Sequence, residues 1–139
     1  MMKKITLIRG LPGSGKTTFA KKMCEDLNAE GGNCTWLESS MYMTDTGIQF
    51  KSPKQVPIIS EWLYEKVEDS LKTYDNVIVA RVASEEKDIR RFKEIAEKNY
   101  AEFVVYRLDT HWEDKCPKFI FEDMKKAVVD WPDEIVITE

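Results

Sequence analysis

The stretch ITLIRGLPGSGKTTFAKKM, residues 5–23, decides the fold. A short apolar run gives way to three glycines and a proline, and a helical pattern begins at Lys16. Within this stretch, residues 10–17 read GLPGSGKT and satisfy the pattern G-x-x-x-x-G-K-[ST]. Such glycines let backbone N–H groups turn inward around a phosphate, and the positive end of the following helix points to the same place. The stretch therefore predicts a strand, a phosphate-binding loop and a helix, in that order.

Each part of this loop has an expected role. We expect ATP or GTP to bind through Gly10, Leu11, Pro12, Gly13, Ser14, Gly15, Lys16, Thr17 and Thr18. Lys16 would reach the β- and γ-phosphate oxygens, and the Thr17 hydroxyl would ligate Mg²⁺. A chance glycine turn is the alternative, but the pattern lies where its mechanism requires, between an apolar strand and a helix. The dinucleotide fingerprint G-x-G-x-x-G competes poorly, because it does not call for the lysine.

Composition limits the other classes of function. The 139 residues are 42% apolar and 33% charged, which is typical of one soluble globular domain. A net charge of −4 provides no general basic field for non-specific binding of duplex nucleic acid. No apolar stretch approaches the roughly 20 residues of a membrane span, so we expect a cytoplasmic protein with no membrane contact. The cysteines, Cys24, Cys34 and Cys116, lack close C-x-x-C spacing and are expected to be reduced and buried.

Strands and helices alternate along the chain. Apolar, β-branched runs predict strands at residues 4–8, 34–38, 76–82, 102–108 and 134–138. Helical patterns begin at Lys16, span residues 57–74, begin at a capping signature at Ser84, and run from near Pro117 to just before Pro132. This alternation predicts one α/β domain over residues 1–139, with a doubly wound, mainly parallel sheet. Residues 38–56 are the longest segment predicted to be irregular, which favours a functional loop.

Beyond the loop, the sequence resembles the small polynucleotide-kinase-like P-loop kinases. The matching stretches are residues 9–20 (RGLPGSGKTTFA), 41–62 (MYMTDTGIQFKSPKQVPIISEW), 77–82 (VIVARV) and 116–134 (CPKFIFEDMKKAVVDWPDE), of which only the first is specific. The resemblance implies a P-loop NTPase fold with helices on both faces of a five-stranded sheet in the order 2-3-1-4-5. It also implies transfer of a phosphate to a hydroxyl of a nucleotide, a nucleic-acid end or a small metabolite.

The chain departs from this family's pattern on the acceptor side. Ser40 stands where the family has an acid that resembles a general base, and Ser60 stands where it has a histidine. Arg81 replaces a small polar or acidic residue, often asparagine, at the end of the third strand. No arginine between residues 112 and 131 matches the lid arginine of the family. The phosphate-binding half is thus intact, whereas the half that activates the acceptor is eroded.

Four residues are the candidates for catalysis: Lys16, Arg81, Glu38 and Asp45. Arg81 would face the phosphates and the magnesium site, because in such folds the third strand lies beside the first. The alternative is that Arg81 points away and pairs with Glu85 or Asp88. Glu38 or Asp45 would replace the missing base, although loop acids are usually only solvated.

Two hypotheses for the function remain open. The first is a phosphotransferase of the polynucleotide-kinase-like group. The second is a nucleotide-binding module without kinase chemistry, acting as a sensor, an inhibitor or a partner-binding protein. A motor-type ATPase is a weak third hypothesis, because the strand VIVARV lacks the acid of a Walker B motif. The acceptor and the oligomeric state stay undetermined.

Overall fold

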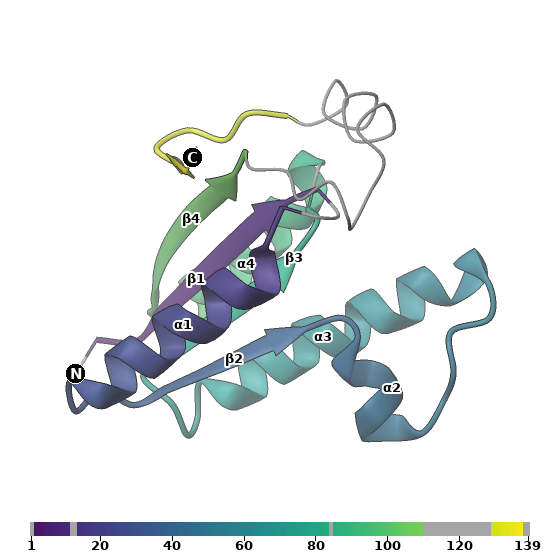
Figure 1. The fold of residues 1–139 in the computed structure, drawn as a ribbon, viewed down its shortest axis with the longest axis horizontal. Coiled ribbons are helices and arrows are strands. Elements are labelled where there is room, and N and C mark those ends of the chain that lie inside the picture. The colour runs from purple at the N-terminus through teal and green to yellow at the C-terminus, as the bar shows by residue number, and fades with distance from the viewer. Residues whose placement is uncertain (1, 12–13, 84, 110–128, 138–139) are drawn as a thin grey trace.

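A computed structural model describes residues 2–11, 14–83, 85–109 and 129–137. Its centre is a sheet of five strands in the order β2-β3-β1-β4-β5, and all neighbouring strands are parallel (Figure 1). The strands are β1 (Lys4–Gly10), β2 (Cys34–Glu38), β3 (Asn76–Arg81), β4 (Glu102–Leu108) and β5 (Ile135–Ile137). The predicted fold class and strand order are therefore confirmed.

Helices cover both faces of this sheet. They are α1 (Lys16–Ala29), α2 (Met41–Thr46), α3 (Val56–Ser70) and α4 (Glu86–Lys98), with a short 3₁₀ turn η1 (Pro53–Gln55) before α3. Figure 1 shows α1 in front of the strands and α3 and α4 behind them. None of the helices in the described part of the chain has the length and apolar character needed to cross a bilayer.

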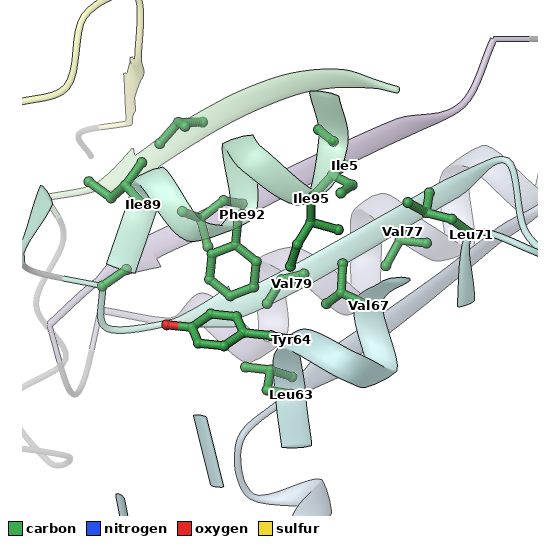
Figure 2. Packing of buried hydrophobic residues seen from close by; sticks show 14 residues of the cluster. Ile5, Leu63, Tyr64, Val67, Leu71, Val77, Val79, Ile89, Phe92 and Ile95 are labelled. Carbon is green, nitrogen blue, oxygen red and sulfur yellow. The ribbon is translucent and has the colours of Figure 1, made fainter. Parts of the chain in front are cut away.

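Two hydrophobic clusters, one on each face, explain this arrangement. On one face, Ile8, Ile78 and Ala80 of the strands pack against Ala20 and Cys24 of α1. The cluster on the other face combines side chains from β1, β3, β4, α3 and α4 (Figure 2). Because successive side chains of a strand point to opposite faces, a continuous apolar strand contributes to both clusters.

The α3–α4 face holds the larger cluster. The ring of Tyr64 on α3 meets the edge of Phe92 on α4 with centroids 5.0 Å apart, beside Val79 of the sheet (Figure 2). This contact joins α3 to α4 below the carboxyl ends of the strands, where the candidate site lies.

The predicted irregular segment is wrong in part, because it contains α2 and η1. Tyr42 of α2 is buried and meets Trp62 of α3 edge-on at 5.6 Å. Ser52 and Gln55 form a capping box that starts η1. An element of six residues is too short to show helical periodicity, so only its tertiary contacts reveal it.

Other boundaries differ by a few residues. β1 extends beyond residue 8 to Gly10, which brings Arg9 into the sheet. The second predicted helix, residues 57–74, ends earlier, at Ser70 of α3. The helix predicted from near Pro117 to just before Pro132 is wrong over residues 129–131, which are described and are not helical. The rest of that helix, the cap at Ser84, the lid positions up to residue 128 and Cys116 lie outside the described residues.

Candidate active site

The phosphate loop joins β1 directly to α1. A Cβ atom on Gly10 would lie 2.5 Å from the Ser14 hydroxyl oxygen and 3.1 Å from the Leu108 carbonyl oxygen, so only glycine fits there. Gly15, at the N-terminus of α1, has a φ of 87°, a left-handed conformation that favours glycine. The Ser14 N–H donates to the Leu11 carbonyl at 3.1 Å and closes the turn. Pro12 and Gly13 lie outside the described residues.

Lys16 is the cation of this loop. Its ammonium donates to the Leu11 carbonyl at 3.1 Å. Burial lowers the pKa of Lys16 to about 8, although the nearby Glu38 carboxylate opposes this shift by raising it. A half-buried ammonium whose charged form is disfavoured gains stability when an anion arrives beside it. Lys16 is therefore suited to a phosphate chain.

Thr17 and Glu38 form a close hydrogen-bonded pair next to Lys16. The Thr17 hydroxyl donates to Oε2 of Glu38 at 2.5 Å, and the Ser40 hydroxyl donates to Oε1 at 2.5 Å. Glu38 is the last residue of β2, so its carboxylate stands at the carboxyl edge of the sheet. The structure thus brings together Lys16, Thr17 and Glu38, which the sequence had singled out separately.

These oxygen donors fit Mg²⁺, although they are few. Hydroxyl and carboxylate oxygens are the ligands that this hard cation prefers, and Mg²⁺ usually takes its remaining ligands from phosphates and water. Across the described residues, no group of three or more His, Cys, Asp or Glu side chains converges in a way that could hold a metal. The Thr17 hydroxyl would therefore be the one direct protein ligand among the described residues, and Glu38 would act indirectly through its hydrogen bond to that hydroxyl. Nucleotide oxygens would supply most of the other ligands.

Arg81 contacts the acceptor-side segments of the chain. One terminal nitrogen donates to the Ser39 hydroxyl at 3.2 Å, and the other donates to the Ser60 hydroxyl at 2.5 Å. The guanidinium also lies over the Tyr64 ring, 5.8 Å from its centroid. The alternative in which Arg81 pairs with Glu85 or Asp88 is wrong: both acids are described, and neither lies within ion-pair distance of it.

Arg81 lines a hollow of about 380 Å³ between the segment after β2, α3 and the end of β3. Ser40 and Ser60 lie in the same wall. The remaining wall is mostly apolar and includes Met43, Phe50, Val56 and Ile59. All three departures from the family pattern that fall on described residues therefore meet at one cavity, which the sequence alone did not reveal.

Asp45, unlike Glu38, has its contacts with α3 and not with the phosphate loop. The indole N–H of Trp62 donates to Asp45 at 3.3 Å, and the Lys66 ammonium lies 3.7 Å away. These contacts hold Asp45 of α2 against α3, whereas only Glu38 reaches the phosphate loop. A catalytic role for Asp45 stays a prediction that its contacts do not favour.

Three arginines stand side by side at the carboxyl edge of the sheet. Arg9 of β1 is in register with Arg81 of β3 and with Arg107 of β4, so all three point to the same face. Arg9 and Arg107 each bind one oxygen of Glu134, both at 2.7 Å. The roles of Arg9 and Glu134 cannot be predicted from the sequence, because nothing local marks a buried pair so far apart in the chain.

A second hollow, of about 540 Å³, adjoins the loop on the α1 side. Gly15 and Thr18 lie at its loop end, and Phe19, Leu108 and Ile137 give it an apolar lining. An apolar surface next to a phosphate loop is suited to the base of a nucleotide.

A family model described as an AAA domain matches residues 5–115 of this chain. The chain belongs to that family. No curated protein sequence matches this AAA domain.

Solved structures share the fold of this AAA domain. The APS kinase CysC of Mycobacterium tuberculosis, in complex with AMPPNP and APS, superposes with a TM-score of 0.69 at 15% identity, covering 99% of this chain and 88% of the kinase chain. A gluconokinase from Sinorhizobium meliloti 1021 superposes with a TM-score of 0.56 at 13% identity, covering 98% of this chain and 82% of the gluconokinase chain. A chain of a Pnkp1/Rnl/Hen1 complex superposes with a TM-score of 0.59 at 22% identity, covering 88% of this chain but only 38% of that chain. At these identities the likeness shows a shared P-loop kinase fold and does not distinguish a polynucleotide-kinase-like subfamily.

Proposed function

We propose that this AAA domain is a phosphotransferase that passes the γ-phosphate of ATP or GTP to the hydroxyl of an acceptor. The observation that carries the proposal is the 2.5 Å hydrogen bond between Thr17 and Glu38, beside the half-buried ammonium of Lys16. A phosphate-binding cation, a hydroxyl that suits a metal and a carboxylate are the groups that phosphoryl transfer requires close together.

Lys16 and the backbone N–H groups of the loop would hold the phosphate chain. Their positive charge would stabilise the negative charge that develops on the transferring group. Mg²⁺, held at Thr17, would neutralise further charge on the phosphate oxygens when it is bound. The apolar hollow by Thr18 and Phe19 would receive the base. ATP and GTP stay equal candidates.

We assign the role of general base to Glu38, because position 40, where the resembled kinases have an acid, is a serine in this chain. Its two oxygens already accept hydrogen bonds from Thr17 and Ser40, which fixes the carboxylate in orientation. The acceptor hydroxyl would give its proton to Glu38 while its oxygen forms a bond to the γ-phosphorus. The bond from that phosphorus to the nucleoside diphosphate would break in the same step, and the diphosphate would leave.

The comparison structures support this proposal at the level of fold. The APS kinase structure contains AMPPNP and APS together, so a protein of this architecture holds a nucleotide and a second ligand at once. The acceptor of the AAA domain would be a nucleotide, a nucleic-acid end or a small metabolite.

A second candidate is a nucleotide-binding module that has lost transfer and acts as a sensor, inhibitor or partner-binding protein. The serines at positions 40 and 60 favour it, because a hydroxyl cannot replace an acid or a histidine in proton transfer. The carboxylate of Glu38 favours the phosphotransferase, because it lies two residues from Ser40 and contacts the Thr17 hydroxyl, to which we assign Mg²⁺.

The test is a transfer assay with γ-labelled ATP or GTP, Mg²⁺ and a pool of nucleosides, oligonucleotides, sugars and hydroxy acids. We expect a labelled product with the wild-type protein, and a loss of about 10²–10⁴-fold in Glu38→Gln, the usual range for a general base. Asp45→Asn is the matched control and should keep the activity. Nucleotide binding without any labelled product would support the nucleotide-binding module, and equal activity in Glu38→Gln would remove Glu38 from the mechanism.

A further inference from the structure

The cavity lined by Ser39, Ser40 and Arg81 contains an arginine that forms no ion pair within the described part of the protein. Of the three arginines in register at the edge of the sheet, Arg9 and Arg107 are ion-paired with Glu134. Arg107 also pairs with Asp130 at 2.5 Å. Arg81, by contrast, has only hydroxyl and aromatic partners among the described residues. Of these three arginines, Arg81 is therefore the one whose half-buried guanidinium would gain most from binding an anion.

The partners of Arg81 hold it in position without neutralising it. Ser39 and Ser60 accept one hydrogen bond each, and the Tyr64 ring supports the guanidinium from one side. A guanidinium has five N–H donors in a planar fork, so donors remain after these two bonds. Such a fork matches the two oxygens of a phosphate or a carboxylate.

Asp88 is the one acid in the wall of the hollow, within the part of the chain that the structure describes. It accepts a long hydrogen bond from the Tyr64 hydroxyl at 3.5 Å and forms no ion pair with Arg81. Its negative charge weakens the attraction of the hollow for anions but leaves the guanidinium fork available. The charge of Asp88 can therefore be removed without touching Arg81, which provides an independent test.

The size and lining of the hollow select a small ligand. Its volume of about 380 Å³ is near the lower end of the roughly 300–1,000 Å³ that small-molecule sites occupy. Phe50 and Val56 line it and are 49% and 46% exposed, so apolar surface is available to a ligand. A ligand with an anionic group and a compact apolar body satisfies both features.

Two consecutive serines connect this anion site to the proposed base. Ser39 binds Arg81, and Ser40 binds Glu38. A ligand held by its anionic group at Arg81 would thus be separated from the Glu38 carboxylate by these two serines, and its hydroxyl would extend past them to the proposed base.

We infer that the hollow is the acceptor site and that the acceptor is a small hydroxyl compound carrying a phosphate or carboxylate group, which Arg81 binds. That the ligand is a phosphate acceptor rests on the proposed phosphotransferase function. The anion site itself can be tested by binding alone.

The experiment titrates three probes into the protein saturated with AMPPNP and Mg²⁺, so that the phosphate loop is occupied, and follows binding by NMR. The probes are phenyl phosphate, phenylacetate and benzyl alcohol, which share an apolar ring and differ in charge. We expect the two anions to bind at the hollow at least tenfold more tightly than benzyl alcohol. The anion that binds more tightly shows which of the two groups the hollow binds better.

Three variants make the test specific to Arg81. Arg81→Gln should weaken anion binding at least tenfold and leave benzyl alcohol unchanged, whereas Arg81→Lys should retain part of the affinity. Asp88→Asn should strengthen anion binding severalfold while Arg81 stays intact, which keeps the test valid if Arg81→Gln fails to fold. Failure of the anions to bind the wild-type protein, or equal binding by Arg81→Gln, would overturn the inference. Anion binding through Arg81 in a protein that phosphorylates nothing would support the site and contradict the phosphotransferase function.

Discussion

The guanidinium of Arg9 and the carboxylate of Glu134 form an ion pair 2.7 Å long, in which the side chains are only 1% and 5% exposed. Arg9 also donates to the carbonyl oxygens of Ala83 at 3.1 Å and Val129 at 2.6 Å. Because Gly10 follows Arg9 directly, this network fixes the end of β1 where the phosphate loop begins. The segment before β5 is thereby attached to the base of the candidate site.

Glu134→Gln should destabilise the protein by about 3–5 kcal/mol, the usual cost of removing one partner of a buried ion pair. The loss arises because Arg9 would keep its charge in a position that water cannot reach. Thermal and denaturant unfolding measure the change. Glu97→Gln is the control, because the Lys93–Glu97 pair is exposed and should contribute less than about 1 kcal/mol. Equal stability of the two variants would show that water enters the Arg9 site.

The sequence predicted the sheet well but not this ion pair, and the reason is physical. Each strand is a local run of apolar, β-branched residues, so its position can be read from neighbouring residues. Arg9 looks like the polar end of such a run, and its partner lies 125 residues away. Similarly, Ser39 and Ser60, which hold Arg81, come from separate elements. The phosphate loop was predictable because all its groups are consecutive, whereas the acceptor hollow is built from segments that only the fold brings together.

Nucleotide binding should take up a proton at alkaline pH, because of Lys16. Its pKa is about 8 in the free protein, and bound phosphates should raise it by favouring the charged form. The bound state then holds more protons, so affinity should fall as the pH rises above about 8. Calorimetry in buffers of different ionisation enthalpy should give uptake of roughly half a proton at pH 8 and almost none at about pH 6.

Variants of Lys16 and Glu38 check this assignment. Lys16→Met should abolish the proton uptake and weaken nucleotide binding. Glu38→Gln removes the charge that raises the pKa of Lys16, so the uptake should begin at lower pH than in the wild-type protein. Proton uptake that persists in Lys16→Met would assign it to another group.

Gly10→Ala should damage nucleotide binding more than it damages the fold. Its new Cβ would lie 2.5 Å from the Ser14 hydroxyl oxygen and 3.1 Å from the Leu108 carbonyl oxygen, so the loop must shift. We expect a loss of stability of about 1–3 kcal/mol, as for other overpacked sites, and at least tenfold weaker binding of ATP. The measurements are thermal unfolding and calorimetric titration.

Gly47→Ala is the matched control for this substitution. Gly47 ends α2 with a φ of 76°, and a Cβ there would meet nothing within 4 Å. The strained backbone should cost about 1 kcal/mol of stability without changing ATP affinity. If both variants bind ATP equally well, the close approach at Gly10 does not shape the phosphate site.

Arg81→Asn should separate acceptor binding from phosphate binding. The contacts of Arg81 are with Ser39, Ser60 and Tyr64. Removing the guanidinium should therefore leave the nucleotide affinity and its dependence on Mg²⁺ unchanged within about twofold. If Arg81 donated a hydrogen bond to a bound phosphate, its loss would instead weaken nucleotide binding by about 1–3 kcal/mol. The KM for the acceptor should rise tenfold or more, because an anionic group would lose its partner. Calorimetry with and without Mg²⁺ and steady-state transfer kinetics provide the two measurements, with Lys16→Met as the control that does lose nucleotide affinity. The opposite result is a stronger dependence on Mg²⁺ together with weaker metal-free binding of nucleotide. It would mean that Arg81 turns from the serines to the phosphates when nucleotide binds, and that it neutralises the transferring group instead of holding the acceptor.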